Sequence, residues 1–287
     1  MAITSGERFR NWGGRNTSIG GRSLIKDTRM QTSLKLDILP QPDDTTCGPT
    51  CLHAVYRYFA DDLPLERVIQ ETGRLDEGGT LAVLLGCHAL ERGYDALIYT
   101  FNLQVFDPTW FAPAAPSLSN RLMAQMAAKD APKLHTASKA YLEFLRLGGE
   151  IRMQDLTSEL IRKYLNREVP ILTGLSATYL YQEPREFAPR SVELRDGGPR
   201  FILDDVRGVP AGHFVVLSGY DKIRRTILVA DPLTPNPLAP RHQYEIGIDR
   251  VKCAILLGIV TYDANLLIIQ PRQNRKGPRS ADPHRRR

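Results

Sequence analysis

The stretch TTCGPTCLHAVYRYF, residues 45–59, places a cysteine where a polar loop runs into an apolar pattern. Its apolar side chains recur at i, i+3, i+4 and i+7, which puts them on one face of a helix; they are Leu52, Val55, Tyr56 and Phe59. Pro49 suits the first turn of this helix, because the N–H that proline lacks has no helical acceptor there. We therefore predict a helix that starts at Cys47 and buries one face.

The predicted position of the Cys47 thiol favours a catalytic role. Unpaired backbone N–H groups and the helix dipole favour an anion at a helix start, and the thiolate is the nucleophilic form of cysteine. A buried structural cysteine is the alternative for any single cysteine. Gln41 lies six residues earlier in the loop. Its side-chain amide and the Cys47 backbone N–H together would form an oxyanion hole for an acyl intermediate.

His213 is the histidine best placed to act as a base. It opens the strand pattern HFVVLSGYD directly after Ala211 and Gly212, whose small size leaves room for a substrate. Gly212 is therefore a candidate substrate contact. The other histidines fall inside predicted helices (His53 and His88), in predicted loops (His135 and His242) or in the C-terminal tail (His284).

A hairpin would bring Asp231 to His213. If the strand of His213 pairs with TILVADP through a three-residue turn at 221–223, the two residues lie opposite each other. Opposed side chains share one face of a sheet with Cβ atoms about 5 Å apart, within reach of a hydrogen bond. A slip of one residue would send Asp231 to the other face. The alternative is that Asp231 merely starts a turn before Pro232.

The order of the patterns predicts helices first and a mainly antiparallel sheet second. Helical patterns cover 65–71, 80–92, 117–129, 136–147 and 156–167, and strand patterns cover 94–101, 169–175, 212–221, 226–232, 244–250 and 266–271. Residues 182–210 are predicted to be mostly loop. No repeat or long linker divides the chain, so we predict one domain over residues 36–270.

The charge is unevenly distributed. Residues 1–35 carry a net charge of +5 and residues 271–287 a net charge of +6, so the 235 residues between them carry −5. We predict a flexible basic N-terminal segment and a disordered, solvated basic C-terminal tail; such tails can bind polyanions without specificity. No specific nucleic-acid partner is expected of the mildly acidic domain.

Several classes of protein are disfavoured. Four cysteines in 287 residues do not make a disulfide framework, and Cys51, Cys87 and Cys253 lie in apolar patterns typical of buried side chains. The scattered histidines predict neither a metal site nor a cofactor. The N-terminus lacks the apolar segment of a signal peptide, and the longest apolar run, at 253–260, is too short to span a membrane. A cytoplasmic location is expected.

Taken together, Gln-x5-Cys-Gly-Pro, Gly-His-Phe-Val-Val-Leu and Val-Ala-Asp-Pro resemble the motifs of the C39 or C39-like family of papain-like cysteine peptidases. The resemblance covers roughly residues 36–270. It implies an α+β papain-like fold, with the nucleophile helix packed against a mainly antiparallel sheet. By position it implies Cys47 as nucleophile, His213 as general base, Asp231 as its orienting partner and Gln41 as oxyanion donor. Members that trim bacteriocin leaders are fused to a membrane transporter, which has no counterpart in this sequence.

The implied activity is hydrolysis of a peptide or isopeptide bond. Two alternatives remain open: a peptidyl transferase similar to phytochelatin synthase, in which an amine resolves the acyl-enzyme, and a catalytically silent peptide-binding module. The expected partner is a peptide or peptide conjugate. A Pro-rich aromatic segment near 106–111 would form a lip of the cleft, with Trp110 and Phe111 as candidate substrate contacts, although such aromatics equally often cover the edge of a core.

Overall fold

The computed structural model describes residues 30–75, 78–187 and 202–272. The basic tails predicted at the two ends lie largely outside these residues. Within them, the predicted order of helices first and sheet second holds in part: six of the eight α-helices end before residue 166 and most strands follow, but three strands, Gln31–Ser33, Tyr94–Thr100 and Glu150–Arg152, come earlier. No helix among the described residues combines the length and the apolar character needed to span a membrane.

The helices form two groups along the chain. The first group holds α1 (Cys47–Tyr58), α2 (Leu65–Glu71), α3 (Ala82–Glu91), α4 (Leu118–Ala128), α5 (Pro132–Arg146) and α6 (Ser158–Leu165), with the 3-10 turn η1 (Pro108–Phe111) before α4. The second holds α7 (Ala177–Tyr181), α8 (Ile248–Leu257) and the 3-10 turn η2 (Gly258–Thr261). The predicted helix start at Cys47 is confirmed.

The main sheet has eight strands among the described residues. Seven follow in the spatial order β3 (Glu150–Arg152), β2 (Tyr94–Thr100), β10 (Asn265–Pro271), β4 (Ile171–Ser176), β7 (Gly212–Asp221), β8 (Thr226–Ala230) and β9 (Gln243–Gly247). The eighth, β1 (Gln31–Ser33), pairs with the end of β7. The pairing of β2 with β3 is parallel, and the other pairings are antiparallel. A two-stranded ribbon of β5 (Glu186–Phe187) and β6 (Ile202–Leu203) stands apart.

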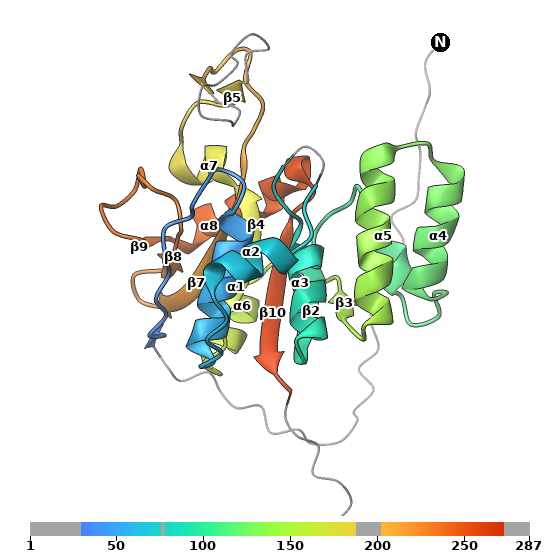
Figure 1. The fold of residues 1–287 in the computed structure, drawn as a ribbon, viewed down its shortest axis with the longest axis horizontal. Coiled ribbons are helices and arrows are strands. Elements are labelled where there is room, and N and C mark those ends of the chain that lie inside the picture. The colour runs from blue at the N-terminus through green and yellow to red at the C-terminus, as the bar shows by residue number, and fades with distance from the viewer. Residues whose placement is uncertain (1–29, 76–77, 188–201, 273–287) are drawn as a thin grey trace, which may run out of the picture.

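Helices cover both faces of the sheet, and the alternation of side chains along β7 shows how. Phe214 and Val216 join the apolar cluster that includes buried side chains of α1, α3 and α5. Val215 and Leu217 join the cluster that includes side chains of α6 and α8. Both faces are therefore buried, and β7 is apolar over most of its length. In Figure 1, α4 and α5 lie at one side of the molecule and β9 at the other.

The predicted α+β class is confirmed, with the helix of Cys47 packed against a mainly antiparallel sheet. Some local predictions are wrong. The strand expected at 244–250 ends at Gly247, because the apolar run that follows forms α8 and covers β4. Cys253 in this helix is exposed rather than buried. His135 lies in α5, which starts at Pro132. The segment 182–210, expected to be mostly loop, contains only the two-residue strands β5 and β6 among its described residues, and 188–201 lie outside them.

A β-bulge interrupts the β7–β8 hairpin. Tyr220 lies opposite Ile227 near the turn, but Leu217 lies opposite Val229, so one extra residue, Ser218, stands on β7 between them. The next residue, Gly219, is enclosed by neighbouring strands. A Cβ there would lie 2.5 Å from the carbonyl oxygen of Thr32 in β1. The close approach of β1 to β7 therefore requires glycine.

We expect Gly219→Ser to lower the free energy of unfolding by about 1–3 kcal/mol, since the new side chain must displace the backbone of β1. Gly247→Ser is the matched control, because a Cβ at Gly247 meets no atom within 4 Å and serine is a good N-cap for α8. Thermal and denaturant unfolding of both variants measures the difference. Equal stability of the two variants would contradict the packing described for Gly219.

Candidate active site

The start of α1 presents two unused backbone donors beside the Cys47 thiol. In the described part of the chain, the Thr50 amide donates to the Thr46 carbonyl, but the Cys47 and Gly48 amides have no backbone acceptor. Cys47 itself is partly exposed. A negatively charged atom next to this thiol would therefore meet free N–H groups.

Gly48 and Cys51 set the distance between α1 and β7. A Cβ at Gly48 would lie 2.5 Å from the Thr80 methyl carbon and 3.2 Å from a ring carbon of Phe214. One turn later, the buried Cys51 thiol donates to the Phe214 carbonyl across 3.2 Å. Since Phe214 follows His213 directly, these contacts hold the start of α1 beside the start of β7.

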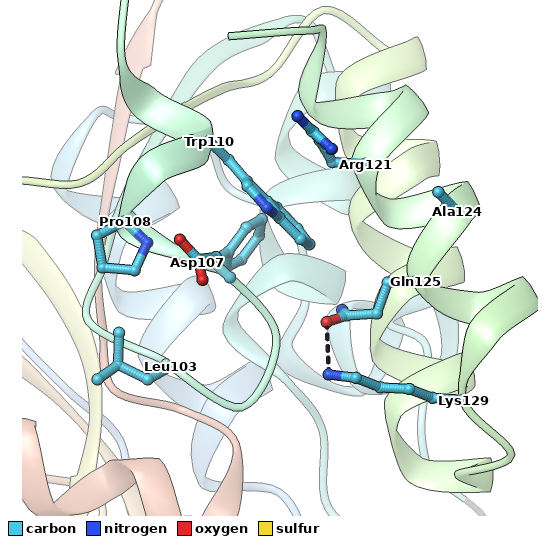
Figure 2. Close-up of a pocket in the computed structure, with 9 residues that line it drawn as sticks. Leu103, Asp107, Pro108, Trp110, Arg121, Ala124, Gln125 and Lys129 are labelled. Carbon is cyan, nitrogen blue, oxygen red and sulfur yellow. Dashed lines mark hydrogen bonds between the residues drawn. The ribbon is translucent and has the colours of Figure 1, made fainter.

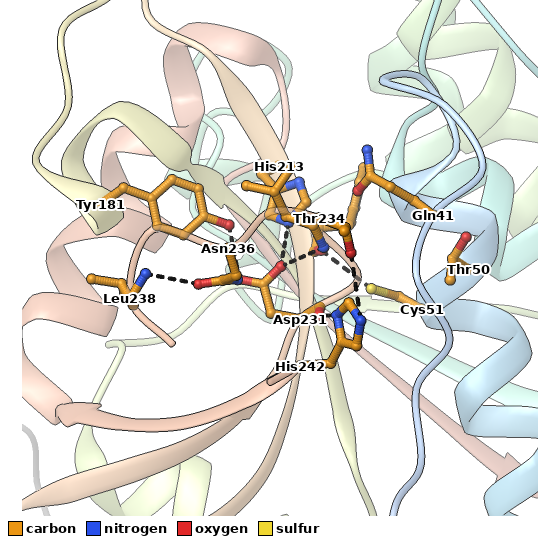
Figure 3. A network of polar contacts seen from close by, with 12 residues as sticks. Gln41, Thr50, Cys51, Tyr181, His213, Asp231, Thr234, Asn236, Leu238 and His242 are labelled. Atoms are coloured by element: carbon orange, nitrogen blue, oxygen red, sulfur yellow. Dashed lines mark hydrogen bonds and ion pairs between the residues drawn. The ribbon is translucent and has the colours of Figure 1, made fainter. Parts of the chain in front are cut away.

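His213 and Asp231 form a buried pair. The His213 Nε2 atom lies 2.8 Å from Asp231 Oδ1, with 7% of His213 and none of Asp231 exposed. Figure 3 shows the two side chains side by side. A hydrogen bond and a charge interaction with Cys47 are among the influences on the His213 pKa, so the thiol lies close to the imidazole. Because Nε2 faces Asp231, Nδ1 is the nitrogen available to Cys47.

The predicted pair is present, but the predicted hairpin register is wrong. The turn spans four residues, 222–225, instead of three. Val216 lies opposite Ala230, so Asp231 falls next to Val215 and two positions away from His213 along the strand. Because the offset between His213 and Asp231 is two residues, both side chains stay on the same face of the sheet. Diagonal neighbours at this offset can still be bridged by a long or aromatic side chain such as histidine.

The bulge at Ser218 is what places Asp231 on the correct face. Near the turn, Asp221 lies opposite Thr226, and this register continued without a bulge would bring Asp231 opposite Val216. The Val216 side chain points to the face of the sheet that α1 covers. The His213 side chain, two residues before Val215 on the same strand, points to the opposite face together with Val215. The extra residue shifts the ladder by one and restores the pair.

Electrostatics favour a charged pair. Burial alone would lower the pKa of His213, but the charge and hydrogen bond of Asp231, with the influence of Cys47, raise it above its ordinary value. Burial alone would raise the pKa of the Asp231 carboxyl. The charge and hydrogen bond of His213, followed by further hydrogen bonds, instead hold this pKa well below its usual range. Imidazolium and carboxylate are therefore the stable forms.

Gln41 lies in the loop before α1, near the other three residues. Its backbone amide donates to the Pro232 carbonyl across 2.9 Å, which ties this loop to the residue after Asp231. The side-chain Nε2 donates to the Asp43 carbonyl across 2.9 Å, and a second N–H remains on the same nitrogen. The Oε1 atom is buried without a hydrogen-bond partner among the described residues.

One cavity of about 280 Å³ contains both Gln41 and His213 in its lining, together with Gly212, Tyr181 and Glu186. Gly212, a predicted substrate contact, therefore lies in the wall beside the imidazole. A Cβ at Gly212 would lie 2.8 Å from the Thr261 hydroxyl, so the packing of η2 requires glycine there. The pKa of Glu186 is raised by burial and then by the negative charges of Asp44 and Glu183, which line the same cavity.

The structure does not bring Trp110 and Phe111 to this cavity. Trp110 lines a separate cavity of about 530 Å³ between η1 and α4, which Arg121 and Gln125 also line (Figure 2). Both aromatic side chains also pack against the apolar cluster of α1, α3 and α5. Phe106, the third aromatic residue of the expected lip, is buried in that cluster with 2% of its surface exposed. Substrate contact by Trp110 and Phe111 stays a prediction.

Two residues of the site were not predicted from the sequence. Tyr181 at the end of α7 and Tyr244 of β9 donate to Asp231 Oδ2 across 2.8 and 2.7 Å. Neither residue stands in a motif with the cysteine or the histidine, and α7 falls in a stretch for which the sequence predicts no element. The described residues contain no group of three or more His, Cys, Asp and Glu side chains arranged to hold a metal ion.

The sequence matches the Peptidase C39 like family over residues 33–252, and the chain belongs to this family. No curated protein sequence matches the chain. Three solved structures are similar over 85% of this chain. A C39-like peptidase from Bacillus anthracis is 13% identical, with 98% of its chain covered and a TM-score of 0.46.

Two further similar structures are also proteases. Xylellain, a cysteine protease from Xylella fastidiosa, is 14% identical, with 87% of its chain covered and a TM-score of 0.40. A double glycine motif protease from an AMS/PCAT transporter, in complex with the leader peptide, is 14% identical, with 100% of its chain covered and a TM-score of 0.38.

We expect Asp231→Asn to lower the pKa of His213 from above its ordinary value to below it, because the charge that opposes burial is removed. Histidine NMR titration of both proteins measures the change. Folding raises the pKa of His213, so the protonated imidazole stabilises the fold fully below its ordinary pKa of about 6.5. Folding lowers the pKa of Asp231, so the ionised carboxylate stabilises the fold fully above its ordinary pKa of about 4. The stability advantage of the wild type should therefore peak between these values and shrink on both sides.

The matched control is Asp249→Asn, which removes an exposed carboxylate paired with Arg225 and Lys252 on the surface. It should leave the His213 titration unchanged. An unaltered His213 midpoint in Asp231→Asn would show that the two groups are not electrostatically coupled.

Proposed function

We propose that this protein is a cysteine peptidase that hydrolyses a peptide or isopeptide bond through Cys47, His213 and Asp231, with Gln41 in the oxyanion hole. One observation carries the proposal: the buried imidazole of His213 lies within hydrogen-bond distance of Asp231 through Nε2, and the Cys47 thiol also contributes to the raised pKa of this imidazole. Membership of the C39-like peptidase family supports the same activity.

In the proposed first half-reaction, the Cys47 thiolate attacks the carbonyl carbon of the scissile bond while His213 holds the thiol proton. The oxygen of the tetrahedral intermediate carries the negative charge, and the free Cys47 amide with the second Nε2 hydrogen of Gln41 would stabilise it. As the intermediate collapses, His213 gives its proton to the leaving amine. The acyl group then remains on Cys47 as a thioester.

In the second half-reaction, His213 takes a proton from water as the oxygen attacks the thioester. Collapse of the second tetrahedral intermediate releases a free carboxylic acid, and the proton returns to the Cys47 sulfur. Asp231 keeps Nε2 protonated throughout, so that Nδ1 is the nitrogen that accepts and donates protons. The substrate would be a peptide or peptide conjugate made in the same cytoplasmic compartment, which enters through the cavity beside His213.

We expect Cys47→Ala to abolish cleavage of any peptide that the wild type cleaves in a peptide-library screen, because the nucleophile is lost. Cys253→Ala, which removes an exposed thiol outside the cavity, should retain activity. Mass spectrometry of the products with candidate amines present distinguishes hydrolysis, which gives a free carboxylic acid, from transfer, which gives an amide.

The same two cysteines provide a direct test of activation. Iodoacetamide at neutral pH should modify Cys47 faster than Cys253, although Cys253 is the more exposed thiol. If Cys47 reacts no faster, the nucleophile is not activated and the protein is instead a peptide-binding module.

We expect Gln41→Ala to lower kcat by about 10²–10³-fold with little change in KM, since the lost donor acts mainly on the transition state. Gln104→Ala is the matched control: its Nε2 also donates to a backbone carbonyl, that of Ile259, but it lies outside the cavity of His213. Steady-state kinetics on one cleaved peptide measure both variants. Equal kcat values in the two would remove Gln41 from the oxyanion hole.

A further inference from the structure

We propose that Tyr181 and Tyr244 are positioning residues of the reaction: their two hydroxyl groups hold Asp231 ionised and fixed, so that Asp231 can orient His213. This inference rests on the proposed function. It concerns two residues that lie 63 positions apart in the sequence and come from different elements, α7 and β9.

The hydrogen bonds around Asp231 are divided evenly between its oxygen atoms. Oδ1 accepts from His213 Nε2 across 2.8 Å and from the Leu233 backbone amide across 3.0 Å. Oδ2 accepts from Tyr181 and Tyr244 across 2.8 and 2.7 Å. The carboxylate therefore has two donors on each oxygen, and its rotation about the Cβ–Cγ bond would break all four.

Both tyrosines remain donors across the working pH range. Burial and then the negative charge of Asp231 raise the pKa of each hydroxyl far above its ordinary value. Cys51 of α1 also faces this group, and burial raises its pKa, so it adds no charge. The His242 ring meets the Asp231 backbone carbonyl and not the carboxylate: its Nδ1 lies 3.0 Å from the carbonyl oxygen. The hydroxyl hydrogen bonds thus favour the ionised carboxylate without introducing a competing charge.

The carboxylate needs these donors because none of its surface is exposed to water. A buried anion without hydrogen bonds is protonated or moves toward solvent. His213 and the Leu233 amide satisfy only Oδ1, so Oδ2 depends on the tyrosine pair. Loss of either hydroxyl group should raise the pKa of Asp231 and loosen the imidazole that it orients.

The two tyrosines differ in one useful way. The Tyr181 side chain also lines the cavity of His213, with its ring centre 6.0 Å from that of the imidazole, whereas Tyr244 does not line the cavity. Replacement by phenylalanine keeps both rings and removes only the hydroxyl groups. Substrate binding should therefore be preserved in both variants.

The experiment compares Tyr181→Phe, Tyr244→Phe and the double variant with the wild type. Each single change should lower kcat about tenfold with KM within about twofold, the effect of one lost hydrogen bond to a charged group. The double variant should also move the acidic limb of the pH profile upward by roughly one pH unit or more, because Asp231 becomes protonated at higher pH.

Tyr164→Phe is the matched control. Its hydroxyl lies 2.8 Å from that of Tyr99, in the same apolar cluster as Tyr181 and Tyr244. This variant should lose thermal stability but keep the wild-type kcat and pH profile. If Tyr181→Phe and Tyr244→Phe, like the control, lose thermal stability but keep the wild-type kcat and pH profile, the two residues are structural and the inference is overturned.

The pH dependence of Cys47 alkylation by iodoacetamide is measured in parallel, since it needs no substrate. If the acidic limb of the alkylation profile moves to higher pH in the double variant, the positioning role is supported. This holds even if the wild type cleaves no peptide, because that result would overturn only the proposed hydrolysis. An unchanged limb in an active enzyme with unchanged kcat contradicts the inference and leaves the proposed function intact.

Discussion

The ionised carboxylate of Asp231 is the constraint on which the site depends. It lies directly after β8 with no exposed surface, so its charge must be balanced entirely by protein groups. Those groups come from β7, from α7, from β9 and from the backbone after β8. These segments must therefore converge on one point, so the packing of the second half of the chain also assembles the surroundings of Asp231.

The first half of the chain joins this point through α1. Gly48 lets the helix approach the Phe214 ring, and Cys51 bonds to the Phe214 carbonyl. Phe214 thus faces the helix while its neighbour His213 faces Asp231. Because side chains alternate along a strand, the start of β7 contacts α1 through Phe214 and presents the preceding residue, His213, to Asp231.

Much of this arrangement could be predicted from the sequence, because it depends on local patterns. The apolar spacing after Cys47 and the position of Pro49 identified the helix and its start, and the apolar run in HFVVLSGYD identified β7. The bulge at Ser218 could not be predicted, since no local pattern marks it and β1, which packs against the adjacent Gly219, is distant in the sequence. The expected His213–Asp231 pair is nevertheless present, because the register beyond the bulge differs from the predicted register by two residues, which keeps both side chains on one face. Tyr181 and Tyr244 carry no local signal, since only the tertiary fold brings them to Asp231.

The charge on the cavity wall acts in the same direction as Asp231. Burial and then the negative charge of Asp44 raise the pKa of Glu186, whereas the positive charge of His213 lowers it. An interaction between two charges is mutual, so ionised Glu186 must also favour the imidazolium form of His213. This carboxylate belongs to the β5–β6 ribbon and not to the main sheet. The β5–β6 ribbon therefore lines the cavity and also places beside it a carboxylate whose negative charge favours the imidazolium form of His213.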